Sequence, residues 1–201
     1  MTQQLVEGLR RFRRESFPLF REHYQRLVAE GQQPSTLFLG CADSRVVPDL
    51  LTSALPGDLF VIRNVGNLVP PFEPDAGFHG TSAGIEFATL VLGVKDIVVC
   101  GHSHCGAIKA LFTPLRDDAP HITRWLELAR PATVGSDMTE ENLRRTEMAS
   151  VVLQVERLMS FPVVRERVER GDLCLHGWYY VIEEGQVLGL DMGSGEFRPL
   201  S

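Results

Sequence analysis

The residues best suited to chemistry in this chain are a lone cysteine and a histidine–cysteine pair, each placed directly after an apolar run. His102 and Cys105 stand three positions apart within the glycine-bracketed segment 101–106, and Cys41 follows the apolar run 36–40. Imidazole nitrogen and thiolate sulfur are donors that zinc prefers, and three protein ligands leave a fourth position open. The pattern predicts one Zn²⁺ per chain, bound by Cys41, His102 and Cys105 in a catalytic site.

An acid and a base accompany Cys41, which a structural zinc site does not need. Cys41, Asp43 and Arg45 alternate, so in an extended segment their side chains would point the same way. Zinc lowers the pKa of a bound water to roughly 7. An Asp that accepts a hydrogen bond from this water would orient it, and a bidentate Arg would keep that Asp ionised. We therefore expect a zinc-bound hydroxide nucleophile oriented by an Asp43–Arg45 dyad.

Other ligand assignments stay open at this stage. His104 could replace His102 if the segment stays extended, although Cys105 would then face away. Asp43 could itself occupy the fourth zinc position and close the site. Four further side chains are interpreted as buried, unreactive thiols or as surface and hydrogen-bonded imidazoles: Cys100, Cys174, His79 and His176.

The elements that would position these residues alternate between strand and helix. Apolar runs predict parallel strands, and the segments between them predict crossover helices; the strands are at 36–40, 59–62, 97–99 and 173–176, and the helices at 48–55 and 81–92. Residues 178–190 show a hairpin pattern. The predicted fold class is α/β: a mainly parallel sheet of about four parallel strands plus a C-terminal antiparallel hairpin, flanked by helices.

Further helices are expected at 106–112, 120–129, 139–160 and 162–171. The first would begin where His102 and Cys105 stand, so that one helical turn aims both side chains the same way. Gly101 would let the backbone turn before them. Active sites of open α/β sheets lie at the carboxyl ends of the strands, which is where the candidate ligands fall.

The length of 201 residues fits a single domain, residues 1–201, with an N-terminal helical arm at 1–31. Within the arm, apolar residues between Leu5 and Ala29 recur at near-helical spacing and are interrupted by Pro18. This pattern predicts two helical segments with a bend between them.

Charge and composition limit the classes of partner and the cellular location that we expect for this chain. The formal net charge of −6 and the pI of about 5.5 argue against a nucleic-acid partner. Apolar runs are too short for a membrane span, and the first residues lack the apolar core of a secretory signal. The four cysteines do not form a disulfide framework, so we expect a reducing, cytoplasmic location.

Two motifs together carry a family resemblance. Residues 41–45 (CADSR) and 101–106 (GHSHCG) resemble the β-class carbonic anhydrases, and the likeness extends through 56–67 to 176–178. The resemblance implies a zinc enzyme that interconverts carbon dioxide and bicarbonate. It assigns zinc to the positions of Cys41, His102 and Cys105 and the catalytic dyad to those of Asp43 and Arg45, with the Asp as the fourth ligand in a closed state.

The plant-like branch of that family implies further features. Its substrate pocket, completed by the partner subunit, is lined at the positions of Gln32, Phe60, Val65, Phe87 and Gly106, and it usually has Tyr where this chain has Phe87. Its obligate unit is a dimer, often paired into a tetramer, with N-terminal helices reaching over the neighbour. The resemblance therefore predicts a homodimer or a dimer of dimers.

The predicted activity is the zinc-dependent, reversible hydration of carbon dioxide to bicarbonate and a proton. Two alternatives remain. The same narrow site would accept other linear heterocumulenes, so the chain could hydrolyse carbon disulfide or carbonyl sulfide. A non-catalytic zinc-binding structural protein would need four permanent protein ligands and would leave Asp43 and Arg45 idle.

Overall fold

The computed structural model describes residues 2–75, 77–114 and 118–200. The chain divides into two compact units, Met1–Gln33 and Pro34–Ser201. Within the described residues, no helix is both long and apolar enough to cross a membrane.

The first unit is helical, as the sequence predicted. It consists of α1 (Thr2–Arg11), a π-helical segment η1 (Phe12–Ser16) and α2 (Phe17–Glu30). Pro18 is the second residue of α2, which follows the π-helical segment directly, so the missing N–H of this proline falls inside a continuous helical run. Gly31, with φ of 80°, ends the helix. The helical character of the arm is confirmed, but the helix is not interrupted at Pro18, because the π-helical segment joins α1 to α2 without a break.

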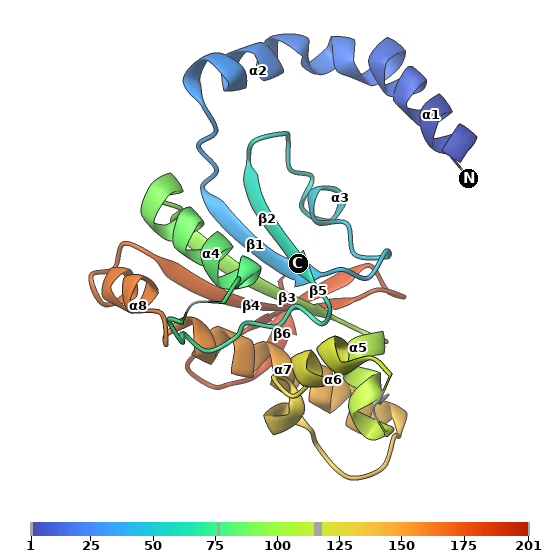
Figure 1. Ribbon diagram of the computed structural model, residues 1–201, viewed down its shortest axis with the longest axis vertical. Coiled ribbons are helices and arrows are strands. Elements are labelled where there is room, and N and C mark those ends of the chain that lie inside the picture. The colour runs from blue at the N-terminus through green and yellow to red at the C-terminus, as the bar shows by residue number, and fades with distance from the viewer. Residues whose placement is uncertain (1, 76, 115–117, 201) are drawn as a thin grey trace. The chain divides into compact units, whose positions relative to one another are not determined.

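The second unit is organised around a sheet, which the described residues build from six strands in the order β2-β1-β3-β4-β5-β6 (Figure 1). The strands β2, β1, β3 and β4 run parallel, whereas β5 and β6 are antiparallel additions. Their bounds are β1 (Thr36–Cys41), β2 (Leu59–Asn64), β3 (Asp96–His102), β4 (Cys174–Val181), β5 (Gln186–Leu190) and β6 (Phe197–Pro199). The predicted α/β class is confirmed; β6 was missed because three residues carry no periodic signal.

Helices connect and cover the strands. Their bounds are α3 (Pro48–Thr52), α4 (Gly80–Glu86), α5 (Gly106–Lys109), α6 (Pro120–Leu126), α7 (Glu140–Leu158) and α8 (Pro162–Glu169), with η2 (Phe87–Leu92), η3 (Ala110–Phe112) and η4 (Arg130–Ala132) as π or 3₁₀ segments. The predicted start of α7 is confirmed by its cap, since the Thr139 hydroxyl accepts the Asn142 N–H at 3.1 Å. The expected helix 106–112 is α-helical for one turn only, before it tightens into η3.

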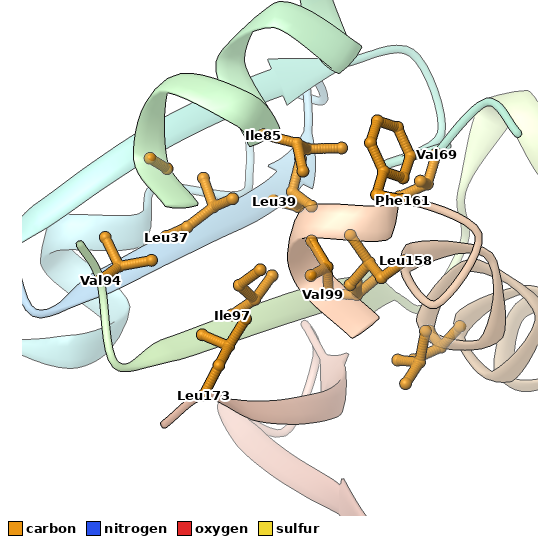
Figure 2. Packing of buried hydrophobic residues seen from close by; sticks show 14 residues of the cluster. Leu37, Leu39, Val69, Ile85, Val94, Ile97, Val99, Leu158, Phe161 and Leu173 are labelled. Atoms are coloured by element: carbon orange, nitrogen blue, oxygen red, sulfur yellow. The ribbon is translucent and has the colours of Figure 1, made fainter. Parts of the chain in front are cut away.

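The main core lies on one face of the sheet. Leu37, Leu39, Ile97 and Val99 pack there with α4, α7 and α8, as Figure 2 shows for side chains such as Ile85. The other face buries Phe38, Val98 and Cys100. Because β1 and β3 are covered on both faces, their sequences read as continuous apolar runs.

Two sequence expectations about the strands need correction. Cys174 is exposed, although we expected a buried thiol, because it is the first residue of β4 and lies at the strand's open end. Gly101 does not turn the chain; it lies within β3, where α7 comes so close that a Cβ would stand 2.5 Å from Val151 Cγ2. The glycine is needed for close packing.

This packing predicts the effect of Gly101→Ala. The added methyl would collide with Val151, so the free energy of unfolding should fall by about 1–3 kcal/mol. Urea unfolding followed by circular dichroism measures this. Gly80→Ala is the control, since a Cβ there meets no atom within 4 Å. Adding Val151→Ala to Gly101→Ala should recover part of the loss; an unchanged midpoint for Gly101→Ala alone would contradict the packing argument.

Candidate metal centre

Three potential metal ligands converge at the carboxyl ends of two neighbouring strands. Cys41 ends β1 and His102 ends β3, and the two strands pair in parallel, so their ends meet at one edge of the sheet. The donor atoms of Cys41, His102 and Cys105 lie within 4.8 Å of one another, and all three residues are buried. In the described part of the chain, no other group of three such side chains comes together in this way.

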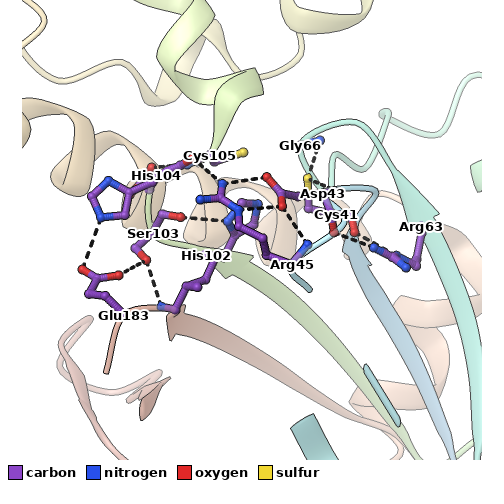
Figure 3. Close-up of polar contacts among 12 residues, drawn as sticks. Cys41, Asp43, Arg45, Arg63, Gly66, His102, Ser103, His104, Cys105 and Glu183 are labelled. Carbon is purple, nitrogen blue, oxygen red and sulfur yellow. Dashed lines mark hydrogen bonds and ion pairs between the residues drawn. The ribbon is translucent and has the colours of Figure 1, made fainter. Parts of the chain in front are cut away.

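The segment between His102 and Cys105 is a turn and not the start of a helix, which corrects our expectation. Cys105 caps the N-terminus of α5, and His104 adopts a left-handed conformation with φ of 56°. This reversal brings the Cys105 sulfur back toward His102. The alternative ligand His104 lies outside the cluster, with its Nε2 3.3 Å from Glu183 Oε1 (Figure 3).

The hydrogen bonding of His102 fits a metal. Its Nδ1 lies 2.9 Å from the carbonyl oxygen of Ser103 and donates to it, which leaves a lone pair on Nε2. His102 Nε2 is buried without a hydrogen-bond partner, one of two such side-chain N or O atoms among residues 2–75, 77–114 and 118–200. Because buried polar atoms are rarely left unpaired, this nitrogen fits a zinc ligand.

The two thiols form an electrostatically coupled pair. A hydrogen bond from the Cys105 thiol lowers the pKa of Cys41 to about 4, helped by N–H groups of Asp43 and Gly66 at 3.4 and 3.3 Å from the sulfur. The same interaction raises the pKa of Cys105 well above its usual value. Burial disfavours imidazolium, yet the thiolate of Cys41 raises the pKa of His102. The ionised sulfur of Cys41 therefore favours a positively charged group in this pocket.

Asp43 and Arg45 form a bidentate pair beside this cluster. Arg45 Nε donates to Asp43 Oδ1 at 2.9 Å, Nη2 donates to Oδ2 at 2.8 Å, and the Arg45 N–H also donates to Oδ1 at 3.0 Å. The Arg45 side chain holds the pKa of Asp43 well below its usual value. The segment is not extended as predicted, because residues 44 and 45 form a turn that folds Arg45 back onto Asp43.

Several supporting residues escaped sequence analysis. Arg63, at the end of β2, donates to the carbonyl oxygens of Cys41 at 2.9 Å and Asp43 at 2.7 Å. Glu147 on α7 is buried and accepts the Cys105 N–H and the Tyr179 hydroxyl, each at 2.7 Å. Burial raises the pKa of this carboxyl. The only local signal was the charge of Glu147 one helical turn before Val151, on the face of α7 that also carries Val155 and Leu158.

The predicted pocket residues are partly brought together. Phe60 and Phe87 are in ring contact with centroids 5.7 Å apart. Val65 and Phe87 are exposed, and Gly106 begins α5 directly after Cys105. Gln32 belongs to the first unit.

Of the four side chains interpreted as unreactive thiols or as imidazoles that bind no metal, all but Cys174 agree with that interpretation. His176 and His79 are hydrogen-bonded to Asp96 at 2.8 Å and Asp75 at 2.7 Å. Cys100 is fully buried, and this burial raises its pKa to about 12.

Comparison with known proteins identifies relatives along almost the whole chain. The carbonic anhydrase family profile matches residues 36–187. A carbonic anhydrase of Pseudomonas aeruginosa is 42% identical over 203 residues, covering 98% of this chain and 91% of the relative. The solved β-carbonic anhydrase CcaA matches with a TM-score of 0.91 at 38% identity, covering 100% of this chain and 92% of that one. A tetrameric β-carbonic anhydrase of Sordaria macrospora matches with a TM-score of 0.82 at 28% identity, covering 94% and 96%.

Fold and site together define an α/β protein with a Cys–His–Cys cluster suited to zinc at the carboxyl ends of parallel strands. The comparisons with known proteins assign this chain to a family. The chain belongs to the carbonic anhydrase family, in its β class, and carbonic anhydrase activity follows from that membership. The resemblance recognised from the two motifs is confirmed.

The thiol pair predicts a pH effect on the metal-free protein. Because the pKa of Cys41 is about 4 in the folded chain against 9.0 ordinarily, this thiol carries a proton in the unfolded state but not in the folded state across this interval. The contribution of Cys41 to the free energy of unfolding should therefore rise with pH there, most visibly below the ordinary imidazole pKa of 6.5, above which the raised pKa of His102 acts in the opposite direction. Thiolate ultraviolet absorption at about pH 6 should be present in the folded protein and lost on unfolding. Cys100→Ser should keep this signal; its persistence in Cys41→Ser would contradict the assignment.

Proposed function

We propose that this chain hydrates carbon dioxide reversibly to bicarbonate and a proton at one Zn²⁺ bound by Cys41, His102 and Cys105. The observation that carries the proposal is the buried, unpartnered Nε2 of His102 beside two thiols. When bound, zinc supplies a Lewis acid that makes water acidic enough to serve as a nucleophile near neutral pH. Three protein donors would leave a position for solvent.

Asp43 and Arg45 are proposed as the catalytic dyad. With its pKa lowered by Arg45, Asp43 is ionised at neutral pH and can accept a hydrogen bond from the attacking water. Only 18% of the Asp43 side chain is exposed, whereas Arg45 is 47% exposed, so the guanidinium holds the carboxylate from the solvent side. Because both Asp43 oxygens are occupied by Arg45, the geometry favours the state in which Asp43 is not a metal ligand.

We propose that the substrate pocket is lined by Gln32, Phe60, Val65, Phe87 and Gly106. The contact between Phe60 and Phe87 provides an apolar wall, which suits a small molecule without a net dipole. The Gly106 N–H would place a substrate oxygen. Phe87 adds no hydroxyl to this wall, so substrate polarisation would rest on the dyad and the backbone.

We also propose a homo-oligomer, either a dimer or a dimer of dimers, in the cytoplasm. Leu5 and Leu9 on α1 are each 66% exposed, and an amphipathic helix of this kind needs an apolar partner surface. A relative from Sordaria macrospora is tetrameric. The four free cysteines suit a reducing compartment. We treat residues 1–201 as one functional domain whose arm, 1–31, serves the assembly.

The ligand set predicts that Cys41→Ser loses zinc. Removing a ligand should weaken zinc binding by more than about 100-fold, because even the loss of a residue that only hydrogen-bonds a ligand costs about 10–100-fold. Elemental analysis of the purified variant measures this. Cys174→Ser is the matched control, since that thiol lies outside the cluster and should leave one zinc per chain. Full zinc occupancy in Cys41→Ser would refute the ligand set.

The dyad predicts that Asp43→Ala keeps zinc but hydrates carbon dioxide poorly. Loss of the group that orients the nucleophile should lower kcat by about 10²–10⁴-fold. Stopped-flow hydration with parallel zinc analysis separates this effect from metal loss. Asp49→Ala, an exposed carboxylate on α3, is the control. An Asp43→Ala variant as fast as the unmodified chain would show that Asp43 has no catalytic role.

A further inference from the structure

The turn that carries His102 and Cys105 is held by a carboxylate from another part of the sheet. Glu183 lies in the turn between β4 and β5, and its Oε2 accepts the Ser103 hydroxyl at 2.6 Å (Figure 3). The same hydroxyl accepts the Ile182 N–H at 2.9 Å, and the Ser103 N–H donates to the Tyr180 carbonyl oxygen at 2.9 Å. Ser103 is buried, so this attachment lies inside the protein.

Glu183 also holds the next residue of the turn. Its Oε1 lies 3.3 Å from His104 Nε2 and accepts a hydrogen bond from Arg144 Nη2 at 2.9 Å. His104 has φ of 56°, a conformation that costs free energy for any residue with a Cβ. Glu183 Oε1 is the carboxylate oxygen beside this side chain, and the contact is an ion pair when the imidazole is protonated.

The conformation of His104 matters because its carbonyl oxygen binds the dyad. Arg45 Nη2 donates to that oxygen at 3.0 Å, in addition to its bonds with Asp43. If His104 moved to an ordinary conformation, its carbonyl group would rotate and this contact would be lost. The guanidinium would then be fixed by Asp43 alone.

We propose that Glu183 is a positioning residue for the Asp43–Arg45 pair, acting through the left-handed turn at His104. The inference rests on the proposed function, because it assumes that the dyad orients the attacking water. An isolated surface ion pair would contribute little. Glu183, however, also accepts a short hydrogen bond from a buried hydroxyl, and bonds to a charged acceptor are stronger than neutral ones.

Glu183→Gln tests the proposal with Glu184→Gln as the matched control. Gln keeps the size of the side chain and one acceptor oxygen but removes the charge that faces His104 and Arg144. We expect kcat for carbon dioxide hydration to fall about 5–10-fold, since small misplacements can cost up to about 10²-fold, with KM and zinc content unchanged. Glu184 is the exposed neighbour, and Glu184→Gln should match the unmodified chain.

A rescue variant separates positioning from general stabilisation. Glycine adopts positive φ without a Cβ penalty, so adding His104→Gly to Glu183→Gln should restore at least half of the lost kcat. A role limited to overall stability predicts no such recovery. Thermal unfolding of each variant measures its stability, so that changes in kcat can be compared with changes in stability.

A structural measurement does not depend on activity. In a crystal structure of Glu183→Gln, the distance from Arg45 Nη2 to the His104 carbonyl oxygen should exceed 3.5 Å, against 3.0 Å here. An unchanged distance with unchanged kcat would overturn the proposal, and so would loss of zinc in step with kcat. If the unmodified chain hydrated no carbon dioxide, the proposed function would fail, while the distance would still decide whether Glu183 positions Arg45.

Discussion

The structure depends on the close burial of three metal-ligand atoms whose hydrogen-bonding needs are met only in part by the protein. Two sulfurs and a nitrogen lie within 4.8 Å, where two thiolates would repel and the imidazole nitrogen has no hydrogen-bond partner. In the protein alone, one shared proton relieves the repulsion, as the opposite pKa shifts of Cys41 and Cys105 indicate. Such a pocket is stable only if rigid elements impose it, and the parallel pairing of β1 with β3 provides this rigidity.

A ring of long-range hydrogen bonds then fixes the loops that leave the two strands. Arg63 from β2 holds the segment after β1, Glu147 from α7 holds Cys105, and Glu183 from the β4–β5 turn holds Ser103. Each support comes from a different element, so the loops are fixed from several directions. Charged side chains suit this role because backbone carbonyls and N–H groups bind them more strongly than neutral ones.

Sequence analysis predicted the parts of the site that can be recognised from residue type and from the neighbouring sequence. Cys41 and His102 end apolar strands, Asp43 and Cys105 follow within three residues, and the parallel sheet follows from the order of those strands. By contrast, the left-handed His104 was missed because its residue type does not require φ above zero. The supporting carboxylates, Glu147 and Glu183, lie far along the chain from the residues that they hold, so their partners are known only from the tertiary fold.

Errors at strand ends have a common cause. Periodicity reports that a segment is buried, but it does not mark where the covering layer stops. Cys174 illustrates this, since it opens β4 at the end of the sheet opposite the ligand cluster, and its side chain is exposed. The chain thus carries one accessible thiol, with Cys100 shielded inside and the other two committed to the cluster. A maleimide dye would attach selectively at Cys174, giving a spectroscopic reporter remote from the reaction.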